Sequence, residues 1–143
     1  MPRHYTLENS GALAAMLEVK NLADSVPKPF KALIELRVSQ INGCSYCIDL
    51  HGREAVELGV AAAKVDALDD AETSGLYDAS EIAAIKWAEA LTRVSNGLAR
   101  EAHHAELNQH YSDREIADLT YIIANMNALN RMAIGYGDKP MKA

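Results

Sequence analysis

Positive charge and long apolar runs are both scarce in this chain of 143 residues. Acidic residues outnumber basic ones by 20 to 14, and the formal net charge is −6. This balance argues against a nucleic-acid partner, because phosphate backbones are bound by clustered Lys and Arg. No stretch approaches the ~20 apolar residues of a membrane span, and the N-terminus lacks the apolar run of a signal peptide. We therefore expect a cytoplasmic protein that binds neither nucleic acid nor a membrane.

Aromatic residues are also few, at 6% of the chain, whereas apolar residues make up 49% and many of them are alanine. This composition favours closely packed helices over a sheet rich in Val, Thr and aromatic residues. The length is that of one domain with a sizeable core. We expect a single all-α domain that covers residues 1–143.

Apolar periodicity and its interruptions predict where the helices lie. Asp78 with Glu81, and Ser112 with Glu115, have the spacing of capping boxes, and each pair precedes a long apolar-periodic stretch. Between the helices we expect an exposed acidic loop over Asp69–Gly75. The other predicted helical segments are 10–24, 30–41, 44–57, 61–68 and a shorter one over 101–110.

The chain has only two cysteines, Cys44 and Cys47, which are too few for a disulfide scaffold. They follow Asn42-Gly43, a pair that favours left-handed backbone and separates two predicted helices. Positions 44, 47 and 51 differ by steps of three and four, so both cysteines and His51 fall on one stripe of a helix. In a reducing compartment such a pair indicates a dithiol that cycles rather than a static crosslink.

The expected position of the dithiol suits redox chemistry. A helix N-terminus and a nearby imidazolium both stabilise a thiolate. A thiolate beside a second thiol can attack a peroxide oxygen, form a sulfenic acid and condense with its neighbour to a disulfide, without any cofactor. Helix-end electrostatics favour Cys44 as the attacking residue, whereas closeness to His51 favours Cys47. We choose Cys47 as the attacking thiol and Cys44 as the resolving thiol.

Two plainer interpretations of the cysteines stay open. Cysteines in an alanine-rich helical protein are often small buried apolar residues. A zinc site needs four ligands, and the two thiols with His51 leave the shell one short, with no second paired Cys or His motif in the chain. We therefore expect neither a metal nor a cofactor.

The stretch from Glu35 to His51 reads ELRVSQINGCSYCIDLH and resembles the core motif of the AhpD-like branch of the carboxymuconolactone decarboxylase superfamily. Trp87–Thr92 and Asn127–Arg131 also resemble this branch, so the similarity extends over about residues 30–134. The resemblance implies an all-α fold of about six to seven helices, with the Cys-x-x-Cys at a helix N-terminus. It also implies assembly into trimers or hexamers.

The same resemblance implies an alkylhydroperoxidase-type activity. It makes Cys47 the thiol that attacks the hydroperoxide, Cys44 the resolving thiol and His51 part of a proton relay. The disulfide is then reopened by a reductant, which is a small thiol or a lipoyl or thioredoxin-like partner.

Two positions depart from the pattern of the family. The acidic residue that commonly stands twelve positions before the first cysteine is replaced here by Ala32. Glu35 lies one turn further along the same helix, and we expect it to serve in the relay if it is buried. Tyr46 stands between the cysteines where the best-studied type has histidine, and a phenol with a pKa of ~10 cannot act as a base near neutral pH.

Two other functions are consistent with these residues. The wider superfamily includes decarboxylases that process lactones without cysteines. A non-enzymatic redox sensor or thiol carrier would use the same dithiol without turnover. Away from the dithiol, we expect Trp87 in core or interface packing, Asn127, Asn130 and Arg131 in bonds between helices or subunits, and His103 and His104 in a solvated segment.

Overall fold

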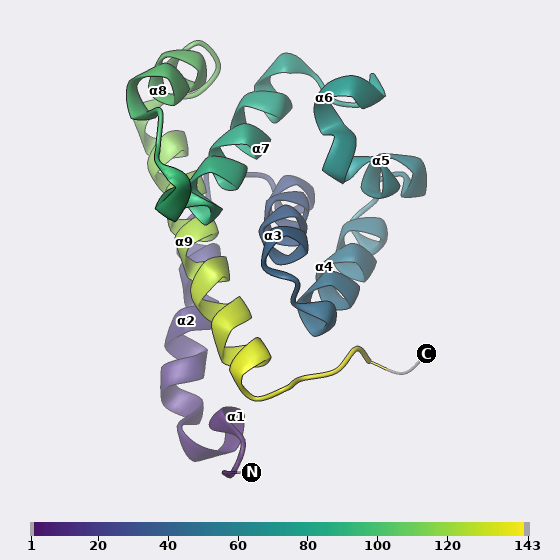
Figure 1. Cartoon of the computed structure of the whole chain (residues 1–143), viewed down its shortest axis with the longest axis vertical. Helices are drawn as coiled ribbons and strands as arrows, with labels where there is room; N and C mark the ends of the chain where they lie inside the picture. The colour runs from purple at the N-terminus through teal and green to yellow at the C-terminus, as the bar shows by residue number, and fades with distance from the viewer. Residues whose placement is uncertain (1, 142–143) are drawn as a thin grey trace.

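The computed structural model describes residues 2–141, and this part of the chain contains nine α-helices and no strand (Figure 1). The predicted all-α fold is therefore confirmed. None of the helices within residues 2–141 is long and apolar enough to cross a membrane. The helices are α1 (Tyr5–Glu8), α2 (Ser10–Leu22), α3 (Lys28–Asn42), α4 (Ser45–Glu57), α5 (Ala62–Asp66), α6 (Ala71–Ser74), α7 (Ala79–Thr92), α8 (Arg100–Asn108) and α9 (Asp113–Gly135), with 3₁₀ turns at Leu68–Asp70 and Val94–Asn96.

Seven of these helices have five residues or more, as the resemblance implied, and α1 and α6 have four each. The segment Asp69–Gly75 is mostly exposed, as predicted, but the prediction of a loop was wrong, because a 3₁₀ turn and α6 occupy most of it. Leu68 and Ala71 are buried and hold this acidic stretch against the core. Gly75, with a φ of +75°, then ends α6.

Both predicted capping boxes are present and begin the two long helices. At the start of α7, the Asp78 carboxylate accepts a hydrogen bond from the Glu81 amide at 2.8 Å, and the Asp78 amide donates to Glu81 Oε1 at 3.0 Å. The corresponding distances between Ser112 and Glu115 at the start of α9 are 3.1 and 2.9 Å. These bonds satisfy amides that the first helical turn leaves without partners.

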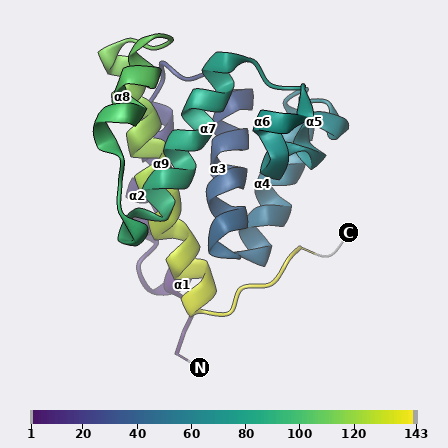
Figure 2. The same cartoon turned by 45° about the horizontal axis from the view of Figure 1, so that its top comes forward.

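Helix α3 is the central element of the fold. It packs against α4, α7 and α9, and Figure 2 shows it between α4 on one side and α7 and α9 on the other. Every residue from Lys31 to Ser39 is buried, including the charged ones. Because neighbouring helices cover α3 along this stretch, the carboxylate of Glu35 is shielded from water.

Polar side chains link α3 to α9 through the core. The Asn42 side chain donates from Nδ2 to Asn127 Oδ1 at 2.9 Å and to Asn130 Oδ1 at 3.0 Å. Asn130 Nδ2 donates to Ser39 Oγ at 3.1 Å. The predicted inter-helix bonding of Asn127 and Asn130 is thus confirmed. Arg131 instead donates to the Asn127 carbonyl of its own helix at 3.0 Å.

Trp87 lies in the core, as predicted, and its indole N–H donates to Thr120 Oγ1 at 3.0 Å. Its ring contacts the rings of His103 and His104 on α8, with centroids 5.8 and 5.2 Å away. The prediction that both histidines are solvated was wrong, because they pack against the indole and are half-buried. The aromatic contacts attach α8 to α7.

Candidate functional site: a dithiol, an imidazole and two carboxylates

Cys44 and Cys47 form a disulfide at the start of α4, with their Cα atoms 5.3 Å apart. Cys44 is the N-cap residue, and its Sγ accepts a hydrogen bond from the Cys47 amide at 3.4 Å. Gly43, with a φ of +71°, allows the chain to turn sharply from α3 into α4. The predicted placement of the Cys-x-x-Cys at a helix N-terminus is confirmed.

The two cysteines are both buried but differ in what they face. Cys44 is 2% exposed and Cys47 is 3% exposed. Cys47 lines a cavity of about 250 Å³, whereas Cys44 is not among the described residues that line it. A small molecule in this cavity therefore meets Cys47. The apolar part of its wall comes from Leu13, Leu17, Leu50, Met126, Leu129 and Ala133.

Helix α1 forms a further part of this wall through Tyr5 and Thr6. The helix is tied to the chain beyond α9 by Asp138, which lies 2.7 Å from His4 Nε2 and accepts a hydrogen bond from the Tyr5 hydroxyl at 3.3 Å. Burial, together with the Asp138 carboxylate, raises the pKa of Tyr5 to about 12, so its hydroxyl stays a donor. The ring of Tyr136 adds an edge contact to Tyr5 at 5.0 Å between centroids.

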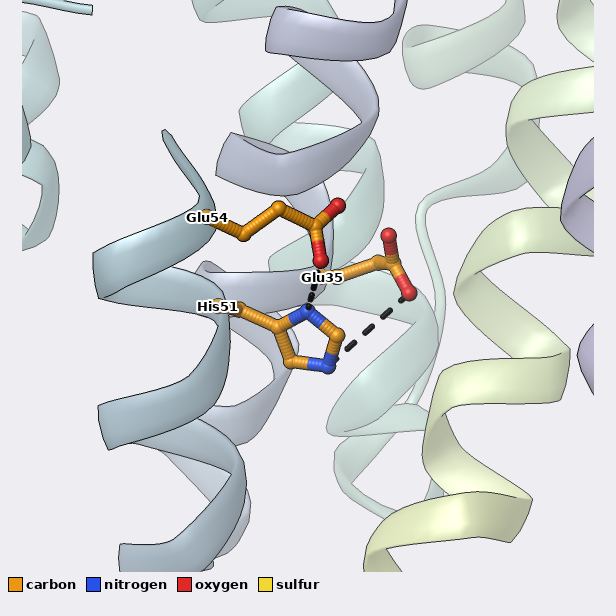
Figure 3. A group of neighbouring side chains, drawn as sticks. All are labelled: Glu35, His51 and Glu54. Atoms are coloured by element: carbon orange, nitrogen blue, oxygen red, sulfur yellow. Dashed lines mark ion pairs between the residues drawn. The ribbon is translucent and has the colours of Figure 1, made fainter. Parts of the chain in front are cut away.

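Each ring nitrogen of His51 faces a different carboxylate, and the two carboxylates lie near each other (Figure 3). Its Nε2 is 3.9 Å from Glu35 Oε2, and its Nδ1 is 3.8 Å from Glu54 Oε2. Both distances exceed a hydrogen bond by about 1 Å, so these contacts are ion pairs only when the imidazole is protonated. Of the predicted site residues, the structure brings His51 and Glu35 together and places Cys47 on the same cavity.

Lys20 of α2 faces the same two carboxylates from the other side. Its Nζ lies 3.6 Å from Glu35 Oε1 and 3.5 Å from Glu54 Oε1. Each carboxylate thus directs one oxygen to the imidazole and the other to the ammonium group. The side chains of Lys20 and Glu54 are each 30% exposed, whereas that of Glu35 is 5% exposed.

This difference in burial contributes to opposite shifts in the pKa values of the two carboxyl groups. Burial raises the pKa of Glu35, and the nearby His51 and Lys20 only partly offset it. For Glu54 the contact with His51 is the largest influence, and together with Lys20 it lowers the pKa in spite of partial burial. Glu35 is therefore the carboxyl group that more readily holds a proton, and Glu54 is the one that stays ionised.

Ligand atoms of Glu35, His51 and Glu54 lie within 4.8 Å of one another, so these residues could hold a metal ion. The Lys20 ammonium group contacts both carboxylates and compensates one negative charge. Sequence reasoning missed both Glu54 and Lys20. The spacing of Glu54, three residues after His51, is a signal for a shared helix face, but the position of Lys20 depends on how α2 packs.

Comparisons with known proteins agree with this fold. The model of the carboxymuconolactone decarboxylase family matches residues 10–90. A protein of unknown function from Agrobacterium tumefaciens, assigned provisionally to antioxidant defence as AhpD, superposes with a TM-score of 0.90 at 29% identity, over 97% of each chain.

Two other solved structures are similar over most of this chain. A peroxidase-related protein from Silicibacter gives a TM-score of 0.80 at 25% identity, over 94% of this chain and 71% of its own. The debrominase Bmp8, in a variant bound to 2,3,4-tribromopyrrole, gives 0.81 at 27% identity, over 95% and 73%. The match over residues 10–90, the fold and the Cys-x-x-Cys at the start of α4 together identify the chain as a member of the carboxymuconolactone decarboxylase family, in its AhpD-like branch.

Proposed function

We propose that this protein is a thiol-dependent peroxidase, which reduces hydroperoxides while Cys44 and Cys47 pass from dithiol to disulfide. The observation that carries the proposal is that Cys47 lines a cavity with His51 and is already paired with Cys44. The antioxidant and peroxidase-related descriptions of two structural neighbours support it.

The reaction begins with the reduced protein. The Cys47 thiol gives its proton to the relay of His51 and Glu35, and the thiolate attacks the terminal peroxide oxygen. The O–O bond breaks, the leaving alkoxide takes the proton to become an alcohol, and Cys47 becomes a sulfenic acid. The Cys44 thiol then attacks the Cys47 sulfur and expels water, which forms the disulfide.

The walls of the cavity favour an organic hydroperoxide with a small apolar group. Six aliphatic or thioether side chains line it, and the volume of about 250 Å³ accommodates such a molecule beside Cys47. The reductant, a small thiol or a lipoyl or thioredoxin-like partner, has to reach the same sulfur. Because Cys47 is only 3% exposed, we expect the reducing thiol to approach through this cavity.

Self-association into trimers or hexamers is also part of the proposal. Leu22 of α2 and Tyr121 of α9 are 67% and 64% exposed and line one surface depression with Ala117. An exposed apolar surface of this kind suits a contact between copies of the chain. Light scattering after size-exclusion chromatography tests this, and Tyr121→Glu should lower the measured mass.

Steady-state hydroperoxide consumption with a dithiol reductant tests the proposed activity. Cys47→Ser should abolish it. When the reductant is left out, Cys44→Ser should allow one turnover that leaves a sulfenic acid on Cys47, detectable by dimedone labelling and mass spectrometry. Ser45→Ala, on the exposed residue between them in the same turn, is the matched control. Wild-type rates in both cysteine variants would contradict the proposal.

Further measurements separate the alternatives: repeated hydroperoxide turnover tests for a redox sensor, and turnover of a muconolactone by the variant that lacks both cysteines tests for a lactone decarboxylase. A redox sensor would be oxidised once and would not turn over when reductant is supplied. A lactone decarboxylase would keep its activity after both cysteines are changed to serine. Turnover of 2,3,4-tribromopyrrole but not of hydroperoxides would point to the chemistry named for the debrominase.

A further inference from the structure

Glu54 and Lys20 are the two charged groups of the site that the proposed relay does not use. Glu54 follows His51 on the same face of α4, and Lys20 reaches the site from α2. Figure 3 shows the Glu54 and Glu35 carboxylates near each other, each facing a different nitrogen of the His51 ring.

The contact between His51 and Glu54 determines which nitrogen of the ring carries a proton. His51 is 5% exposed, and its Nδ1 has no hydrogen-bond partner within residues 2–141, so Glu54 Oε2 at 3.8 Å is the acceptor that faces it. An ionised carboxylate only accepts hydrogen bonds, so it favours a proton on Nδ1. The lone pair of the neutral ring then lies on Nε2, on the side of Glu35.

Lys20 keeps the two carboxylates in this arrangement. Glu35 and Glu54 each have an oxygen within 4.8 Å of the other, so without the ammonium group the two carboxylates would repel each other directly whenever both are ionised. With Lys20 3.5 Å from Glu54, the carboxylate stays charged and is held beside α4 instead of turning to solvent.

We propose that Glu54 and Lys20 are positioning residues of the dithiol site: Glu54 fixes His51 with its proton on Nδ1, and Lys20 holds Glu54 in place. This leaves Nε2 as the nitrogen that exchanges protons during the reaction. The catalytic part of the inference rests on the proposed function, whereas the position of the proton on His51 does not.

Other ionisable groups surround this cluster and contribute to any pH dependence. Tyr5, Tyr46 and Cys47 line the dithiol cavity. Lys20, Glu35 and Glu54 also line a neighbouring depression of about 310 Å³ together with Lys28 and Lys31. The described part of α9 contributes no charged side chain to the cavity, since its lining residues are Asn125, Met126, Leu129 and Ala133.

The first test is the tautomer of His51, measured by ¹⁵N–¹H correlation NMR on the oxidised protein without peroxide. We expect the neutral ring to be protonated on Nδ1 in the wild type and to shift toward Nε2 protonation in Glu54→Gln. Glu57→Gln, one turn further on an exposed position of α4, is the matched control. An Nε2-protonated ring in the wild type would overturn the inference whatever the enzyme assays show.

The second test is the pH dependence of iodoacetamide alkylation of Cys47 in the reduced protein, with Cys44 changed to serine. Glu54→Gln should raise the alkylation midpoint by about one pH unit, because the imidazolium that stabilises the thiolate loses the carboxylate beside it. Lys20→Met should also raise the midpoint, because Glu54 loses the ammonium group that holds its carboxylate beside His51. Lys20→Arg should restore the wild-type midpoint. A purely structural role would lower the yield of folded protein and leave the midpoint unchanged, and that result would refute the inference.

If hydroperoxide is turned over, Glu54→Gln should lower kcat about tenfold and leave KM nearly unchanged, as for other residues that orient a catalytic histidine. A wild type that shows the expected tautomer and alkylation shift but no turnover would refute the proposed peroxidase and leave the positioning roles intact. The two failures are therefore distinguishable.

Discussion

Glu35 stands eight residues before Gly43 and His51 stands eight residues after it, and their side chains meet with Oε2 and Nε2 3.9 Å apart. Helix α4 turns back along α3 at Gly43, so residues at equal distances from the turn lie opposite each other (Figure 1). Ala32 is one turn further from Gly43 along α3 and is fully buried. This geometry explains why the α3 residue whose carboxylate faces His51 is Glu35 and why position 32 is too far along the helix.

The burial of Glu35 predicts a pH-dependent effect of Glu35→Gln on stability. Because burial raises the pKa of Glu35 in the folded protein, the fold favours the neutral carboxyl group. The corresponding stability is present at acidic pH, below the pKa of the unfolded chain, and is lost as pH rises through the raised folded value. Thermal unfolding followed by circular dichroism should therefore show that the melting temperature of Glu35→Gln rises relative to that of the wild type as the pH increases above ~4.3, the ordinary pKa of glutamate. A constant difference, as expected for Glu57→Gln, would contradict this account.

The asparagine network predicts a large cost for Asn130→Ala. Asn130 is fully buried. The hydrogen bonds of its side-chain amide with Ser39 and Asn42 connect α9 with the end of α3, just before the dithiol. Its removal leaves buried polar groups without partners and opens a small cavity, so we expect a loss of about 2–3 kcal/mol in the free energy of unfolding. Urea denaturation measures it. Asn108→Ala, at an exposed position, is the control and should cost less than about 0.5 kcal/mol; equal costs would argue against the network.

The link between α1 and Asp138 predicts how accessible Cys47 is to large reagents. Asp138→Ala removes the acceptor of both His4 and Tyr5, and Tyr5 is part of the cavity wall. We expect α1 to detach more often, so that a bulky maleimide alkylates Cys47 in the reduced protein at least about fivefold faster, while small iodoacetamide reacts at nearly the same rate. Quenched time courses analysed by mass spectrometry give both rates. An equal acceleration with both reagents would indicate a general loosening of the fold instead.

Two glycines at the dithiol turn and in α4 predict opposite effects of substitution by alanine. Gly43 has a φ of +71° with open space around its Cα, so Gly43→Ala meets no clash but should cost about 1 kcal/mol of stability through backbone strain. Gly43→Asn should cost less, because asparagine tolerates the left-handed region. Gly52 lies in the interior of α4, also with open space, and Gly52→Ala should stabilise the protein by roughly 0.5–1 kcal/mol. Chemical denaturation of the three variants checks the order.

Features encoded in a few consecutive residues were predictable from the sequence. The capping pairs, the Asn42-Gly43 break and the start of a helix at the Cys-x-x-Cys each depend on local backbone geometry. The helical character of Ala71–Ser74 was not predictable in this way, because two buried apolar side chains outweigh an acidic composition there.

The rest of the site depends on contacts between distant segments. Lys20 meets Glu35 and Glu54 because α2 packs beside them, and nothing in the residues next to Lys20 indicates this. The same holds for Tyr5, which reaches the cavity because Asp138, near the other end of the chain, holds α1 in place.

The near-complete burial of Cys44 and Cys47, at 2% and 3% exposure, affects how the protein exchanges electrons with its surroundings. A disulfide is opened by a thiolate that must approach one of its sulfur atoms along the S–S axis, so limited access slows exchange with dissolved thiols. We expect the oxidation state of this protein to be set by the molecules that fit beside Cys47, and to follow changes in the bulk thiol pool only slowly.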